Sequence, residues 1–525
     1  MRAKSNRRWC RSLITSGVIG AAAIALWGCN GGDSSSDESP LPVGVVKATC
    51  GPNDKPETDL QGQVSAATRA AGFKGFSCNL QLVGQSKGDG GSWQHAFFQD
   101  KSGHQCNYYD TASFTANRSN LGVVVIDGGN AASPTPTAYL ATTAMLDPWE
   151  SLKVNERRQL LGGVNALNGN GGPEIEIYDL SGDCLHPQLL TGAQVGTGNN
   201  APDEFKAAVR GHEGNFAPDG LTYYAANLGA GYIYPIDITN PTKPKMLTQY
   251  FTAPGRVHGL NISDDGNRAY VAILGQGGAN SARAPGSPPN NGLQILDTSE
   301  VQARKPNPEL KVVSTITWDD GGGAQHAIPV TIKGKPYVIH VDEAGSGGNN
   351  SAGWAAACAA GLPAWQFARI IDIADETKPT VVAKLMLEAY DPKNCDKVVP
   401  DLAGLGSFTY GAHYCSVDNR LNATTLACGY FNSGIRVFDI RNPLRPKEIA
   451  YYNPAGTTTS SPGSNHLRTG GWVAGGPDWC TSQVRLDVAT ATLQTMCQDN
   501  GFLTLKFTNG VWPFPESTTP PGLQN

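Results

Sequence analysis

The sequence lacks several signatures by which enzymes are identified. It contains no Walker A phosphate loop, no HExxH zinc motif and no GxGxxG turn after a strand. No two cysteines have the CxxC spacing that is typical of structural zinc sites. Only 16% of the residues are charged, and the formal net charge is −5. This charge balance gives no reason to expect nucleic acid as a partner.

Long apolar runs are also scarce. The one continuous run, at residues 13–28, follows a basic segment and is short for a bilayer span. It ends in Leu26-Trp27-Gly28-Cys29, which resembles the lipobox of bacterial lipoprotein signals. The resemblance implies that residues 1–29 are a signal peptide and that Cys29 is acylated as the new N-terminus. The alternative is an ordinary signal peptide, or a short anchor, with a chance cysteine.

The segment after Cys29 supports a lipid anchor. Residues 30–44 (NGGDSSSDESPLPVG) have the polar composition of a flexible tether. We therefore expect an exported protein that is held to a membrane of the bacterial cell envelope. Asn30 is not the Asp associated with inner-membrane retention in some bacteria, which favours the outer membrane.

Ten cysteines follow Cys29, and an even number in an exported chain predicts disulfides. Two pairs flank turns and can each join neighbouring strands: Cys415 with Cys428, and Cys480 with Cys497. The sequence leaves open how the other six are paired. These are Cys50, Cys78, Cys106, Cys184, Cys358 and Cys395.

Short β-branched runs broken by Gly, Asn, Asp and Pro fill the rest of the chain, which favours an all-β fold. One phrase recurs, an apolar strand that ends in Asp and leads into a turn often containing Asn-Pro. Its fullest copies are YIYPIDITNPTKPK (232–245), ARIIDIADETKPT (368–380) and GIRVFDIRNPLRPK (434–447). The Asp can accept backbone N–H groups in the turn, and Pro then ends the strand pairing. Six strands of this kind end at Asp127, Asp179, Asp237, Asp297, Asp372 and Asp439.

This recurring strand resembles the LVIVD-repeat family, whose members are interpreted as β-propellers. The resemblance covers most of residues 122–452 and is strongest in the three fullest copies. It implies a propeller fold and no single shared activity. The physics agrees, because a four-stranded sheet cannot bury both faces alone and must stack on neighbours around an axis.

A second phrase precedes each such strand and usually begins with His. Four copies carry a Gly eight residues after the His, as expected for a hairpin of two strands. In one copy a Glu takes the place of the His. The chain therefore predicts a seven-bladed β-propeller, whose blades start near His95, Glu150, His212, His258, His326, His413 and His466.

The two ends of the chain are expected to meet in the last blade. FLTLKF (502–507) has the pattern of its third strand, and only a Pro-rich segment follows. NLQLVGQS (79–86) has the pattern of an outer strand without a blade of its own. We expect this N-terminal strand to close blade seven, which removes an exposed edge. The expected organisation is signal peptide 1–29, tether 30–44, N-terminal arm or cap 45–78, propeller 79–508 and tail 509–525.

Six of the nine histidines begin the strand nearest the axis, and two interpretations stay open. Each imidazole can hydrogen-bond to neighbouring backbone and lock blade to blade. Alternatively, three or four imidazoles can bind copper, iron or zinc in the channel. Glu150 is then a ligand, a weak candidate for a general base, or a counter-charge, whereas Glu213 is expected to be a solvated loop carboxylate. The candidate metal ligands are His95, His212, His258, His326, His413 and His466.

Two hypotheses about function follow. The first is a binding or scaffold propeller that recognises a protein or glycan at its rim, with insertions at residues 345–365, 390–408 and 453–464. The alternative is a metal-dependent, oxidase-like enzyme that uses a His-lined central channel. The sequence names no substrate for either. The rim candidates are Trp354, Trp365, Trp472 and Trp479.

Overall fold

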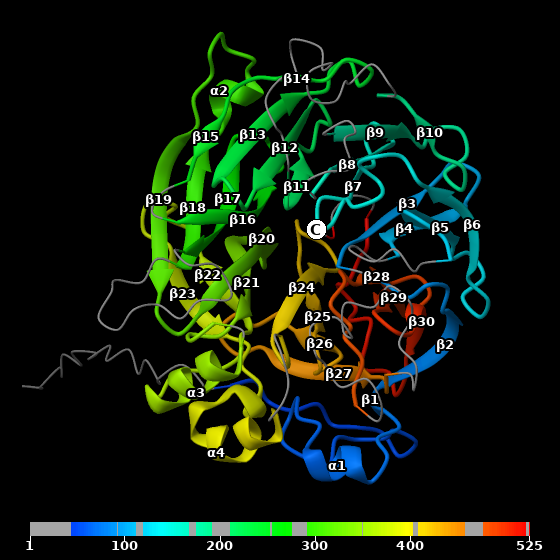
Figure 1. The fold of residues 1–525 in the computed structure, drawn as a ribbon, viewed down its shortest axis with the longest axis vertical. Helices are drawn as coiled ribbons and strands as arrows, with labels where there is room; N and C mark the ends of the chain where they lie inside the picture. The colour runs from blue at the N-terminus through cyan, green and yellow to red at the C-terminus, as the bar shows by residue number, and fades with distance from the viewer. Residues whose placement is uncertain are drawn as a thin grey trace, which may run out of the picture. The chain divides into compact units, whose positions relative to one another are not determined.

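The computed structural model of the protein contains seven antiparallel sheets arranged around one axis (Figure 1). The predicted seven-bladed β-propeller is therefore confirmed. It lies within the unit Leu41–Asn525. Among the described residues, no helix has the length and hydrophobicity to cross a membrane. The structure describes residues 44–91, 93–111, 119–166, 175–191, 211–252, 255–275, 291–348, 350–402, 408–456, 476–520 and 524.

In each blade the strands follow one another from the axis to the periphery. Blade one consists of β3 (His95–Gln99), β4 (Gln105–Asp110), β5 (Val123–Asp127) and β6 (Thr135–Leu140). Blade two consists of β7 (Lys153–Asn155), β8 (Leu160–Val164), β9 (Ile175–Asp179) and β10 (Gln188–Leu189). Blade three consists of β11 (Glu213–Phe216), β12 (Thr222–Asn227), β13 (Tyr232–Asp237), β14 (Lys245–Met246) and β15 (Tyr250–Phe251).

The remaining blades follow the same plan. Blade four consists of β16 (Arg256–Ile262), β17 (Arg268–Gly275), β18 (Asn291–Asp297) and β19 (Lys311–Trp318). Blade five consists of β20 (Gly322–Ile332), β21 (Lys335–Ala344), β22 (Ala368–Asp372) and β23 (Thr380–Lys384). Blade six contains β24 (Ala412–Val417), β25 (Thr425–Tyr430), β26 (Ile435–Asp439) and β27 (Lys447–Asn453), and blade seven contains β28 (Arg485–Asp487), β29 (Thr492–Cys497) and β30 (Gly501–Phe507).

The N-terminal chain completes the ring. Strand β2 (Leu80–Ser86) pairs with β30 and closes blade seven, as predicted from the sequence. Just before it, β1 (Phe76–Cys78) pairs with β27 and adds a fifth strand to blade six. The N-terminal chain therefore joins blade six to blade seven.

Seven buried apolar clusters hold the blades together, one between each pair of neighbours. At the seam, Tyr109 and Ile126 of blade one pack against Met496 and Phe502 of blade seven. Each fully buried side chain of this size contributes about 1.5–3 kcal/mol. Stacking between blades is thus the main source of stability, as expected for a radial repeat.

The strand-end Asp and the turn Gly have the roles in the turns that the sequence predicts. In all six copies the carboxylate of the strand-end Asp accepts the backbone N–H two residues later, at 2.8–3.0 Å. The four Gly residues that follow the ring histidines have positive φ, a region that favours glycine. They are Gly103, Gly220, Gly266 and Gly334.

The expected disulfides are present, and all ten cysteines after Cys29 are paired. Cys106–Cys184 joins blade one to blade two. The other bridges are Cys50–Cys78, Cys358–Cys395, Cys415–Cys428 and Cys480–Cys497.

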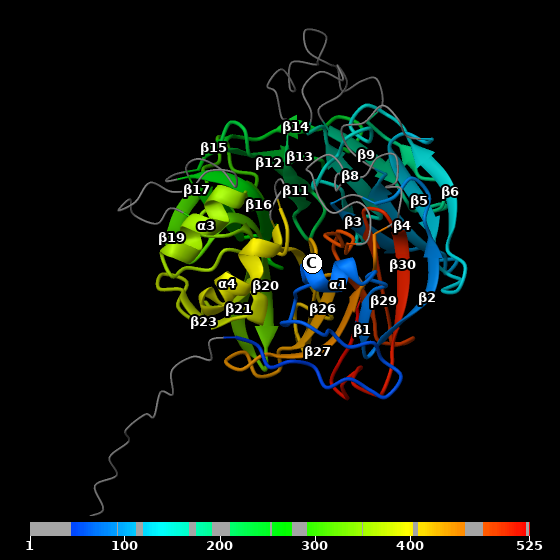
Figure 2. The ribbon, with the colours of Figure 1, turned by 60° about the horizontal axis from the view of Figure 1, so that its bottom comes forward.

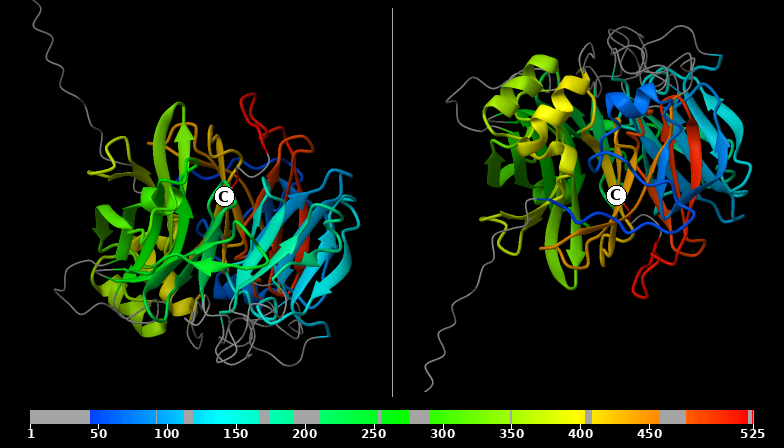
Figure 3. Two further views of the ribbon diagram at one scale, coloured as in Figure 1. Left: turned by 90° about the horizontal axis from the view of Figure 1, so that it is seen from above. Right: turned by 90° about the horizontal axis from the view of Figure 1, so that it is seen from below.

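Short helices lie outside the blades. The helices of the insertions at 345–365 and 390–408 lie on one side of the propeller, together with the N-terminal helix (Figures 2 and 3). Cys358–Cys395 ties two of them together, and Arg69 of the N-terminal helix donates to the carbonyl of Asp401 at 2.9 Å. The helices are α1 (Ala66–Ala70), α2 (Ser299–Gln302), α3 (Ser351–Ala359), η4 (Glu388–Tyr390), η5 (Pro392–Asn394), α4 (Cys395–Val398) and η6 (Val399–Leu402).

The predicted start of blade seven is wrong. Its first strand is β28, which begins at Arg485 and not near His466. Only Leu486 of this three-residue strand is buried, so no apolar alternation marks it in the sequence. Cys29, His466 and Trp472 lie outside the described residues.

Candidate functional site

Three of the ring histidines meet at one carboxylate on the axis. Nε2 of His413 lies 3.0 Å from Oε1 of Glu150. Nε2 of His212 and Nε2 of His258 lie 3.3 Å and 3.6 Å from its Oε2. The three histidines belong to blades six, three and four, and Glu150 precedes the first strand of blade two. Stacking the blades thus brings together residues that are far apart in the sequence.

The backbone around Glu150 explains how it reaches the axis. Its N–H donates to the carbonyl of His212 at 3.2 Å, and the two chains form a short parallel bridge at Glu150 and Glu213. The preceding residue, Trp149, has φ +49°, which is a strained conformation for a bulky side chain. Such strain persists only where the surrounding contacts enforce it. Here both side chains contact His212.

Two further carboxylates surround the histidines. Glu343 lies on β21. Its Oε1 is 3.6 Å from Nε2 of His258, and its Oε2 is 3.4 Å from Nε2 of His413. Oε2 of Glu213 lies 3.7 Å from Nδ1 of His258. The sequence reasoning missed Glu343, because an acidic residue at the end of a long strand carries no repeat signal.

The expectation that Glu213 is a solvated loop carboxylate is wrong. Glu213 is only 2% exposed, because it begins β11 and points between blades. Gly259 makes room for it, since a Cβ there would lie 1.7 Å from Oε2 of Glu213. In the sequence, the Gly that follows His258 was the one sign that a neighbouring side chain comes close to the backbone here.

Burial and mutual attraction shift the pKa values of Glu150, His258 and His413. Burial alone would raise the pKa of Glu150, but the adjacent His212, His413 and His258 hold it well below its usual range. Burial alone would lower the pKa of both imidazoles, but the carboxylates raise that of His258 to about 9 and that of His413 to about 10. Without a metal ion, the site is thus a buried cluster of paired charges.

The donor set also suits a transition metal ion. Among the described residues, one ligand atom each of Glu150, His212 and His258 lie within 4.8 Å of one another. Two imidazoles and one carboxylate form the protein ligands of many catalytic zinc and non-haem iron sites. Nδ1 of His413 faces the carbonyl of Thr481 at 3.0 Å and must donate to it. This arrangement leaves Nε2 of His413 directed at the site and orients the ring as an outer partner commonly does.

Two other ring histidines do not join this cluster. His95 contacts the carbonyl of Gln483 in the segment before β28 at 3.3 Å, and Oδ1 of Asn107 at 2.9 Å. Nε2 of His326 lies 3.3 Å from both the N–H and the carbonyl oxygen of Cys415 on blade six. These two imidazoles join neighbouring blades, as the framework interpretation describes.

An aromatic cluster lies beside the histidines around Glu150. The ring of Trp93 is 5.2 Å from that of His413, and the ring of Trp149 is 5.5 Å from that of His212. Phe431 and Trp479 pack behind them. These residues come from loops and strand ends, where no periodicity marks them, and the sequence reasoning assigned none of them to the axis. They place an apolar wall beside a strongly charged site.

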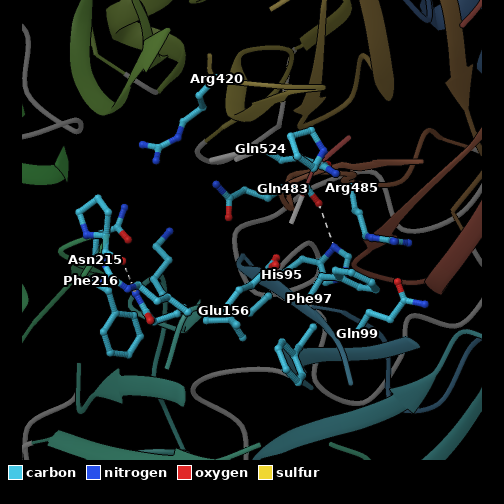
Figure 4. Close-up of a pocket in the computed structure, with 18 of the residues that line it drawn as sticks. His95, Phe97, Gln99, Glu156, Asn215, Phe216, Arg420, Gln483, Arg485 and Gln524 are labelled. Carbon is cyan, nitrogen blue, oxygen red and sulfur yellow. Dashed lines mark hydrogen bonds between the residues drawn. The ribbon is translucent and has the colours of Figure 1, made fainter. Parts of the chain in front are cut away.

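A cavity of about 620 Å³ lies near the cluster, although none of Glu150, His212, His258 and His413 lines it. Lys153 connects the two, because it lines the cavity and its Nζ is 3.8 Å from Oε1 of Glu213. Figure 4 shows His95 and Gln483 joined at the cavity wall. Arg420 at the same wall is already paired with Asp264 at 2.6 Å. Lined by amides, paired charges and a few aromatic rings, the cavity has room for a small polar molecule.

The three predicted rim tryptophans that the structure describes do not form a contact surface. Trp354, Trp365 and Trp479 are 1%, 3% and 0% exposed. The first two fill the core between blades five and six, because the insertions fold back on the propeller. This burial corrects the expectation that they are available to a protein or glycan.

Comparisons with known proteins describe the fold alone. No protein-family model and no curated protein matches the chain, so membership of the LVIVD-repeat family stays a prediction. A putative 6-phosphogluconolactonase from Bacteroides uniformis is similar in structure, with a TM-score of 0.48, 13% identity and coverage of 79% of this chain and 93% of that one. For the periplasmic gluconolactonase of Pseudomonas aeruginosa the values are 0.45, 13%, 73% and 87%, and for the hydrazine synthase of Kuenenia stuttgartiensis they are 0.45, 14%, 82% and 97%. Similarity this distant carries no activity from one protein to another.

Proposed function

We propose that this protein is a lipid-anchored enzyme of the bacterial cell envelope that works with a transition metal ion on the propeller axis. Glu150, His212 and His258 bind the ion, and Nε2 of His413 lies beside it, next to Glu150. The anchor is the lipid on Cys29, as the signal segment predicts. The small polar substrate enters from the cavity that Lys153 links to the cluster.

One observation carries this proposal: imidazoles from three blades direct Nε2 at the same carboxylate, at 3.0–3.6 Å. A framework role explains His95 and His326, which hydrogen-bond to the backbone of the next blade. It does not explain why three other ring positions place their nitrogens around an acid. Grouped imidazole and carboxylate donors are the ligands that iron, copper and zinc accept.

The ligand set leaves positions for chemistry. Catalytic zinc and non-haem iron sites commonly keep three protein ligands and an open position for water or substrate. The bound ion would polarise a substrate oxygen or activate a bound water or dioxygen. Glu213 lies beside Nδ1 of His258 and orients that ring. Glu343 faces Nε2 of His258 and of His413, on the side where the ion would lie. The aromatic wall excludes water from one side, which strengthens these electrostatic interactions.

Metal analysis of matched variants tests the proposal. The full chain is extracted from membranes without chelators. Its iron, copper and zinc contents are then measured in the wild type, in His258→Ala and in His326→Ala. Both histidines are buried and occupy the same repeat position in adjoining blades. We expect about one ion per chain in the wild type and in His326→Ala, and a loss of that ion in His258→Ala. A Cys29→Ser chain should move to the soluble fraction with its ion retained.

Two results would overturn the proposal. A folded wild-type chain that contains no ion, and takes up none from added iron, copper or zinc, would leave a binding or scaffold propeller whose cavity holds its ligand. Equal ion content in both histidine variants would place the metal elsewhere.

A further inference from the structure

A second group of histidines and carboxylates lies away from the axis, between blades one and two. Nδ1 of His104 is 2.8 Å from Oδ2 of Asp100 and 3.9 Å from Oδ1 of Asp183. Nδ1 of His186 is 2.7 Å from Oδ2 of Asp183. Asp100 and His104 belong to the β3–β4 turn of blade one, and Asp183 and His186 to the β9–β10 connection of blade two. Two blades therefore contribute one carboxylate and one imidazole each.

Several bonds hold the two halves of this group together. The Cys106–Cys184 disulfide lies next to both halves. The hydroxyl of Tyr108 donates to the carbonyl of Cys184 at 2.7 Å. The side chain of Asp100 is only 2% exposed, and its Oδ1 accepts the backbone N–H groups of Ser102 and His104. The four candidate ligands thus lie where a disulfide and hydrogen bonds fix the two blades to each other.

The separations match the size of a tetrahedral metal site. Ligands about 2.0–2.1 Å from a zinc ion lie about 3.3 Å from one another. The three measured separations, 2.7, 2.8 and 3.9 Å, bracket that value. One ligand atom each of Asp100, His104 and Asp183 also lie within 4.8 Å of one another. His186 is not among these three, but its exposed side chain already contacts Asp183 and can rotate to bring a second imidazole to the ion.

The local charge favours a cation. Among the residues that the structure describes, neither Asp100 nor Asp183 forms an ion pair with a lysine or arginine, and their charged neighbours are the two histidines. Imidazole donors favour zinc, copper or nickel over calcium or magnesium, which prefer oxygen. We propose that Asp100, His104, Asp183 and His186 form a zinc-type metal site that clamps blade one to blade two. This site is independent of the axial centre.

Zinc titration of the full chain tests the clamp. Zinc is titrated against a chromophoric chelator into the wild type, the double variant His104→Ala/His186→Ala, and Lys101→Ala as a control in the same turn. We expect the double variant to bind one zinc fewer than the wild type, and Lys101→Ala to bind the same number. Asp183→Asn keeps the shape of the turn but removes a charge, and it should weaken this one site at least about 10-fold.

The outcomes separate this site from the axial one. Loss of a zinc in the double variant but not in His258→Ala supports the clamp even if the axial site binds nothing. Unchanged zinc number and affinity in the double variant would overturn it, as would a wild type that binds no zinc. Both imidazoles are about half exposed, so the variants should fold. Circular dichroism, and the absence of free thiols at Cys106 and Cys184, confirm that they do.

Discussion

The histidines at equivalent repeat positions form two groups with different surroundings. His95 and His326 lie against neutral partners, namely backbone groups of the next blade and side-chain amides. His212, His258 and His413 lie around an ionised Glu150. Burial is nearly complete for all except His212, so burial does not separate the groups. What separates them is whether a neighbouring blade places a carboxylate or a carbonyl in front of the ring.

This difference has opposite electrostatic consequences. Burial lowers the pKa of His95 to about 4, so its imidazole is neutral at pH 7. For His413 the carboxylates of Glu150 and Glu343 outweigh the same burial and raise the pKa to about 10. A repeated residue type therefore does not imply a repeated role. Five blades carry the histidine at this position among the described residues, and the adjacent blade decides its surroundings.

Removing the shared carboxylate should have the largest effect on this contrast. Glu150→Gln leaves buried imidazolium groups without their main counter-charge, which is expected to lower the free energy of unfolding by about 3 kcal/mol. Urea denaturation of the metal-free chain measures it. The control is Glu376→Gln, which removes the negative charge of a partly exposed partner of Arg268 and should change the free energy of unfolding by less than about 1 kcal/mol. Equal effects would show that Glu213 and Glu343 suffice to hold the histidines.

Because His95 is neutral in the folded chain, its contribution to stability should depend on pH. Below pH 6.5 the unfolded chain protonates His95, whereas the folded chain does so only near pH 4. The stability due to the buried neutral ring is therefore complete above pH 6.5 and is lost as the pH falls toward 4, by about 3 kcal/mol. The difference in unfolding free energy between the wild type and His95→Asn should shrink by that amount over this range. A difference that stays constant would contradict a neutral His95.

The smallest effect on stability is expected for the strand-end aspartates, which have the same role in every copy of the repeat. The six strand-end aspartates all accept the same turn N–H, so Asp372→Ala and Asp179→Ala should each lower the free energy of unfolding by about 1 kcal/mol. Asn retains an acceptor oxygen, and Asp372→Asn should be close to neutral. Unequal losses in the two Ala variants would show that blade context alters the aspartates as it alters the histidines. Thermal or urea unfolding gives the comparison.

Most of the fold was predictable because its determinants are local and repeated. The strand-end Asp, the turn Gly and the apolar strands recur in register, and they predicted seven blades and the closing role of β2. Blade seven was misplaced near His466 because β28 is too short to show a pattern. The site was predictable only in part. His212, His258, His413 and Glu150 were candidates, but nothing in the sequence separated them from His95 and His326.

The sequence by itself determined the architecture, the turn chemistry and which residues lie nearest the axis, because these depend on short-range patterns repeated along the chain. Only the tertiary structure decided which imidazoles meet a carboxylate, that Glu343 and the buried Glu213 join them, and that Asp100 and Asp183 from different blades share a junction. The reason is physical. These contacts form between blades, and their geometry depends on how neighbouring sheets stack and not on the residues within any one repeat.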